Sequence, residues 1–136
     1  MEYSYLVDQA NIFNVAYNTI KEGLIARASH DGFIVEESNK KIVLHAFFDE
    51  IFFCPKVVFH LGTPYLYIKI YKEKSSGDEV ILRKLYIDGF NGLFIGSIES
   101  GIKGSASPNI LYNLFVSLID ESSKKEGLFF SHHNNN

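Results

Sequence analysis

The sequence predicts one α+β domain in which a helix, an antiparallel meander of about six strands and a second helix follow one another, the last packed on the sheet. Three observations lead to this fold class. Apolar residues recur at helical spacing before residue 30, they alternate with a period of two from Phe33 to about Ile98, and helical spacing returns after Pro108. Short links between the alternating stretches favour hairpins, and therefore antiparallel pairing.

The first helix is expected to run for about four turns, with Asp8 as its N-cap and Gly23 near its end. Its apolar face is expected to comprise Ile12, Phe13, Ala16, Tyr17, Ile20 and Leu24. Polar residues on the opposite face make this an amphipathic helix with one side directed to a core. Asp31-Gly32 marks the turn that follows.

The middle of the chain is rich in β-branched and aromatic residues, which favour strands. Strands are expected from Phe33 onward and over about 42–48, 56–61, 65–71, 80–87 and 93–98. Asp49-Glu50 is expected to be a pivot, 72–78 a solvated hairpin tip, and 88–92 a tight turn because it holds two Asx-Gly pairs.

The second helix has the clearest start signal. Ser107 can cap it and Pro108 fits its first position, after a Gly- and Ser-rich loop from Ser100 to Ala106. The apolar stripe of this helix comprises Ile110, Leu111, Leu114, Phe115 and Leu118. We expect the domain to span residues 1–123, and we expect residues 124–136 to form a polar, frayed tail.

Composition narrows the class of protein. A chain of 136 residues fits one domain, and an apolar fraction of 46% is enough for a core. The net charge of -3 and the lack of a basic block argue against nucleic acid, and no apolar run is long enough to suggest a membrane span. A single cysteine and no visible signal peptide lead us to expect a cytoplasmic protein.

Both faces of the predicted sheet carry apolar or aromatic residues, although two helices can cover only one. An exposed apolar face usually marks an interface, and tyrosine suits a surface that is partly wet. The predicted interaction face comprises Phe47, Val58, His60, Tyr65, Tyr67 and Tyr71. The alternative is a tightly curled sheet that encloses a second core of its own.

The loop before the second helix superficially resembles a phosphate-binding loop between Gly96 and Ser105. Ile102 separates Gly101 from Lys103, and the helix starts too late for that motif. A weaker possibility is an anion held by backbone N–H groups at the helix start. The residues of that possible anion or ligand site are Lys103, Gly104, Ser105 and Ser107.

No catalytic or metal-binding motif is readable. Cys54 lies in an apolar strand, which is typical of a buried structural cysteine. Neighbouring strands could bring His45 and His60 together, with Asp49 or Glu50 as a third ligand, but no ligand spacing supports a metal. The adjacent acids Glu36-Glu37 point to opposite faces of a strand and form no dyad. We therefore expect no enzyme, no metal and no cofactor.

Some segments resemble ubiquitin-conjugating-enzyme-like (E2-like) domains. The stretch from Phe53 to Phe59 looks like their strand with proline followed by K-V-x-F, and Ser107-Pro108 with the leucines after it looks like their W-S-P-x-L helix start. The stretch from Thr63 to Tyr71 is similar to the central strand of autophagy enzymes of this type. The tryptophan, the H-P-N segment and the catalytic cysteine of the family are missing, so the resemblance implies an inactive interaction domain.

These observations predict a non-enzymatic protein-interaction module, of adaptor, inhibitor (immunity) or chaperone type, that uses an aromatic sheet face. Its partner is expected to be another protein or a second copy of the chain. The alternative is a small-ligand-binding protein with a pocket between the sheet and the C-terminal helix. Ligand-dependent melting would indicate the second class, and concentration-dependent melting the first.

Overall fold

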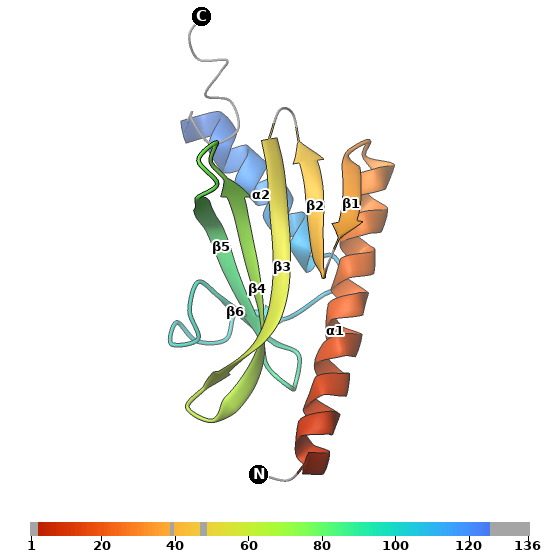
Figure 1. Ribbon diagram of the computed structural model, residues 1–136, viewed down its shortest axis with the longest axis vertical. Coiled ribbons are helices and arrows are strands. Elements are labelled where there is room, and N and C mark those ends of the chain that lie inside the picture. The colour runs from red at the N-terminus through yellow and green to blue at the C-terminus, as the bar shows by residue number, and fades with distance from the viewer. Residues whose placement is uncertain (1–2, 39, 47–48, 126–136) are drawn as a thin grey trace, which may run out of the picture.

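The computed structural model describes residues 3–38, 40–46 and 49–125 (Figure 1). It confirms the predicted α+β fold, with a helix at each end of an antiparallel sheet. The described residues form seven strands that pair in chain order, so the sheet is a simple meander. The elements are α1 (Tyr3–His30), β1 (Ile34–Ser38), β2 (Lys41–Ala46), β3 (Asp49–His60), β4 (Thr63–Glu73), β5 (Glu79–Ile87), β6 (Gly92–Ile95), β7 (Gly104–Ser105) and α2 (Ile110–Lys125).

Helix α1 is about twice as long as the sequence predicted. It spans 28 residues, so Asp8 lies inside it rather than at its cap, and the helix continues past Gly23. Close packing explains why a glycine stands at position 23, because a Cβ there would lie 1.9 Å from the Pro108 carbonyl oxygen. The contact with the segment before α2 therefore outweighs the weak helix propensity of glycine.

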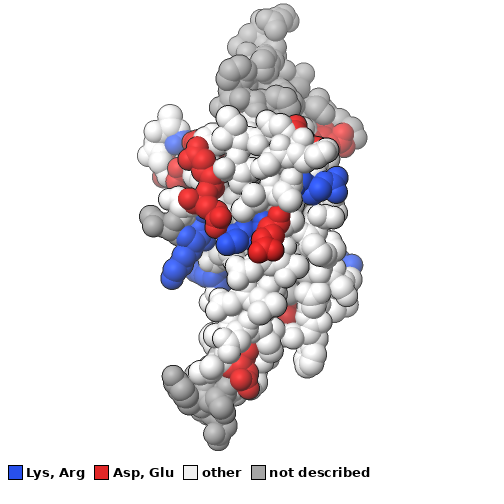
Figure 2. Space-filling model, turned by 90° about the vertical axis from the view of Figure 1, so that its right-hand side faces the viewer, with Lys and Arg blue, Asp and Glu red and all other residues white. Residues whose placement is uncertain are grey.

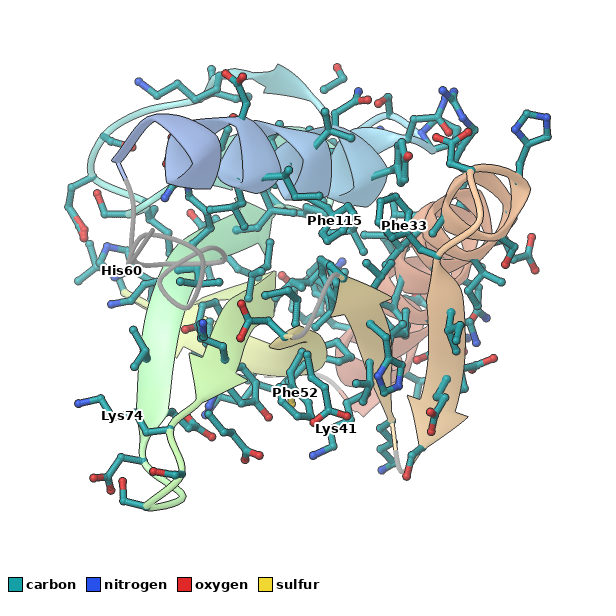
Figure 3. All side chains as sticks on the ribbon, turned by 90° about the horizontal axis from the view of Figure 1, so that it is seen from above. Phe33, Lys41, Phe52, His60, Lys74 and Phe115 are labelled. Carbon is teal, nitrogen blue, oxygen red and sulfur yellow. The ribbon has the colours of Figure 1, made fainter. Side chains whose placement is uncertain are left out.

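The main core lies between the two helices and one face of the sheet, which we call the inner face (Figure 3). Phe53, Ile68 and Ile70 from β3 and β4 have no exposed surface, nor do Leu111 and Phe115 from α2. Phe33 meets the Phe115 ring edge-on, with centroids 5.1 Å apart. These side chains fill the contact between the sheet and α2.

Ile12 departs from its expected place in this core. Phe13, Ile20 and Leu24 of α1 are buried as expected, whereas Ile12 is 40% exposed and Val15 is 66% exposed. The longer helix explains the difference, because the first half of α1 extends below the β1–β2 hairpin, where less of the sheet can cover it (Figure 1).

Two polar contacts hold α2 in place. The Tyr112 hydroxyl donates to the Asp31 carboxylate, just after the end of α1, and Arg83 of β5 forms an ion pair with Glu121. The Arg27 guanidinium lies over the Tyr112 ring, 5.4 Å from its centroid. These contacts fix both ends of α2 over the inner face.

Two features of the sheet were not predicted. Asp49 begins a strand instead of a pivot, and β3 continues through Pro55 to His60. The loop expected over 100–106 contains the short strand β7, which pairs Gly104 and Ser105 with β6.

The predicted tail 124–136 begins inside the last turn of α2, and residues 126–136 lie outside the described part. No helix in the described part is both long and apolar enough to span a membrane.

Candidate functional site

The outer face of the sheet, opposite the helices, is organised in rows. Residues paired across antiparallel strands point to the same side, so the strand register shows which outer side chains are neighbours. The upper row is Val43, Phe52, Tyr71 and Ile81, and the lower row is Lys56, Tyr67, Tyr86 and Phe94.

The upper row forms a small second core. Phe52 and Tyr71 stack with centroids 5.1 Å apart, and both are buried together with Val43. The Lys41 ammonium lies 4.9 Å from the Phe52 centroid, and that of Lys69 lies 4.6 Å from the Tyr71 centroid. Figure 3 shows Phe52 and Lys41 together on the side away from the helices. Tyr71 is only 4% exposed, so it offers little surface to a partner.

The lower row remains open and borders a cleft of about 340 Å³. Tyr67 and Tyr86 stack on its floor with centroids 4.9 Å apart. Beside them, Tyr65 meets Phe94 edge-on at 5.7 Å and His60 at 6.4 Å. We call this the tyrosine cleft; it is lined by Lys56, Val58, Phe59, His60, Tyr67, Tyr86, Ser97, Ile98 and Glu99.

The strongly twisted β3–β4 hairpin and the loop after β6 form the walls of the tyrosine cleft. Phe59 is 57% exposed, and Leu61, at the hairpin turn, is 92% exposed. Lys56 and Glu99 place opposite charges at its border. Burial raises the pKa of Tyr86, with a further contribution from Glu99, and burial is also the main cause of the raised pKa of Tyr67. Both hydroxyls therefore stay protonated near neutral pH and can donate hydrogen bonds.

The structure brings Val58, His60, Tyr65 and Tyr67 together, four of the six residues of the predicted interaction face. Tyr71 lies in the buried upper row, and Phe47 lies outside the described residues. Sequence reasoning missed Tyr86, Phe94 and Glu99. Tyr86 could have been found, because it alternates with the buried Leu85 and Ile87 on β5, whereas burial does not alternate along β6, which carries Phe94, or along the loop that carries Glu99.

The four residues of the possible anion site do not form a cradle at the start of α2. Gly104 and Ser105 pair with β6, and the Lys103 N–H donates to the Leu93 carbonyl at 2.6 Å. The Ser107 carbonyl accepts from the N–H of Ile110. The Lys103 N–H is thus bonded within the fold, and Gly104 and Ser105 belong to a strand rather than to the first turn of α2.

His45 and His60 lie at opposite ends of the β3 register, so the metal site considered from sequence does not assemble. His45 instead contacts two acids: its Nε2 is 2.7 Å from Glu36 Oε1, and its Nδ1 is 3.5 Å from Glu50 Oε2. Within the described ranges, no group of three His, Cys, Asp or Glu side chains is arranged to hold a metal ion. Cys54, the single cysteine of the chain, is half-buried and is not part of a disulfide.

Comparison with protein-family models, with curated proteins and with solved structures gave no match to this chain.

Proposed function

We propose that this chain is a non-enzymatic protein-interaction module that docks a partner chain in the tyrosine cleft. The observation that carries the proposal is the half-exposed Tyr67–Tyr86 stack, on a sheet face that no helix of the described part of the chain covers. Tyrosine supplies a large contact area and a hydrogen-bonding hydroxyl, and it is enriched where binding energy concentrates. Adaptor, inhibitor and chaperone roles all use such a surface.

The first occupant that we assign to the cleft is a second copy of the chain. A two-fold contact is self-complementary, so each residue meets the same surface of its partner. The border of the cleft carries both Lys56 and Glu99, which allows opposite charges to face one another across such an axis. A surface with a single sign of charge would instead repel its own copy.

The test is the native mass of the full chain, measured by native mass spectrometry at micromolar concentration. We expect twice the chain mass for the wild type and a monomer for Tyr67→Lys. Ile81→Lys is the matched control, because Ile81 is 46% exposed on the same face but belongs to the upper row. This control is expected to remain dimeric.

A wild-type chain that stays monomeric up to tens of micromolar overturns the self-association. If Tyr67→Lys lowers the melting temperature, Lys56→Glu supplies a second variant at an exposed position. It is expected to weaken the dimer without unfolding the chain. Equal dimerisation of Lys56→Glu and wild type would place the dimer contact elsewhere on the surface.

A further inference from the structure

The lower half of β3 has a free edge. Pairing between β2 and β3 ends at Ile42 with Phe53, whereas pairing between β3 and β4 continues to His60 with Thr63. In the described part of the chain, residues 54–60 therefore have β4 on one side and no strand on the other. Figure 1 shows the β1–β2 hairpin ending halfway down β3. An unpaired strand edge presents backbone donors and acceptors that can pair with another extended chain.

A cavity of about 540 Å³ lies beside this edge, between β3 and α1. Its lining includes the apolar residues Phe13, Tyr17, Pro55, Val57 and Leu66. Val57 is 46% exposed, although its cross-strand partner Leu66 is buried. The space that a continued β2 would occupy is thus open and partly apolar.

Lysines surround the same cavity, although the chain as a whole has a net charge of -3. The lining includes Lys21, Lys40, Lys41 and Lys56, and one acid, Glu37. Glu37 pairs with Lys21 at 3.1 Å and so offsets one of the four positive charges. Figure 2 shows Lys and Arg side chains gathered about the middle of the α1 side of the molecule.

We propose that the free edge of β3 takes up a short, extended, acidic segment of a partner protein as an added strand. Main-chain pairing supplies the affinity in this mode of recognition, and pockets for alternate side chains supply the selectivity. Apolar residues of the segment enter the cavity over Tyr17 and Leu66. Its carboxylates face the lysines at the rim, so the segment alternates apolar and acidic residues.

Pro55 and Lys56 explain why the edge does not simply pair with the same edge of another copy. Proline has no N–H to donate, and a lysine on an edge strand disfavours edge-to-edge pairing. A second copy would bring its own Lys56 toward the lysines of the first, whereas an acidic segment meets no such repulsion. This inference does not rest on the proposed function: Lys56 lines both the cavity and the tyrosine cleft, but the free edge and the other lysines of the cavity are not part of that cleft.

The experiment measures binding of a fluorescent, capped hexapeptide, Glu-Val-Glu-Val-Glu-Val, to the full chain by anisotropy at low salt. We expect saturable binding that weakens about tenfold for the double variant Lys21→Gln with Lys40→Gln. The matched control is Lys74→Gln with Lys84→Gln, which removes the same charge at exposed positions outside the cavity lining. This control is expected to bind like wild type.

A second peptide tests the added strand itself. The same hexapeptide N-methylated at alternate amides keeps its charge but loses backbone donors on one edge, so at least one of the two alternating patterns is expected to bind more than tenfold weaker. Equal binding of both N-methylated patterns and the parent would overturn strand addition, because charge alone would then explain the affinity. Absence of peptide binding also overturns it. Binding of 8-anilinonaphthalene-1-sulfonate that depends on Lys21 and Lys40, without peptide binding, would assign the cavity to a small anion instead.

Discussion

The two faces of the sheet use the same kinds of residue but are covered differently. Phe53 and Ile70 on the inner face have no exposed surface, because α1 and α2 lie over them. Phe52 and Tyr71, one position away on the same strands, are covered mainly by each other and by two lysine side chains. Tyr67 and Tyr86, in the lower row of the same face, have no such cover and are half-exposed. The covering element, and not the residue type, decides which aromatic residues remain available to a partner.

The adjacent phenylalanines of β3 give the sharpest test of this difference. Phe53→Ala is expected to lower the free energy of unfolding by about 3–5 kcal/mol, because it opens a cavity between sheet and helices. Phe52→Ala is expected to cost only about 1–2 kcal/mol, since lysine stems and water can fill the space. Urea unfolding followed by circular dichroism measures both. Equal losses would show that the outer cluster is as tightly packed as the inner core.

Packing on the helix side of the sheet can also be tested by a substitution in α1, without any change in the strands. Gly23→Ala places a methyl group against the Pro108 carbonyl, so α1 and the start of α2 must move apart. We expect a net loss of about 1–2 kcal/mol, although alanine favours a helix by up to about 1 kcal/mol over glycine. Thermal unfolding is the measurement. A more stable variant would mean that the two helices can separate there without cost.

The extent to which the sequence predicts the structure differs between the fold and the candidate site. Alternation along β4 gave both faces correctly, because Leu66, Ile68 and Ile70 are buried on the inner face and Tyr67 and Lys69 between them belong to the outer face. The length of α1 could not be predicted, since the contact that keeps Gly23 helical comes from residue 108. The same limit applies to Tyr71, whose burial depends on Phe52 across the strand pair. Contacts between segments that are distant in the sequence decide the conformation at Gly23 and the burial of Tyr71, and the local sequence carries no signal of such contacts.

Tyr112 of α2 should make the stability of the fold depend on pH in alkaline solution, and this effect is the smallest that we expect. Burial and its hydrogen bond to Asp31 raise the pKa of Tyr112 to about 12, above the ordinary value of 10.0. The folded state thus holds this proton more tightly than the unfolded chain. Its contribution is complete below pH 10 and is lost as the pH rises toward 12.

The measurement is the melting temperature between about pH 8 and pH 12, a range of about four pH units around the ordinary pKa of tyrosine. Tyr112→Phe is expected to decline less steeply than wild type above pH 10. Identical slopes for wild type and Tyr112→Phe would show that the Asp31 contact contributes nothing to stability.

The meander order has a consequence for how the chain reaches this structure. Every strand pairs with its neighbour in sequence, so the hairpins can form locally and early, without waiting for distant segments. The inner face, in contrast, is not closed until residues 110–125 arrive to meet α1. During synthesis a nearly complete sheet would therefore expose Phe53 and its neighbours to water, and this interval is when the chain is most prone to aggregate.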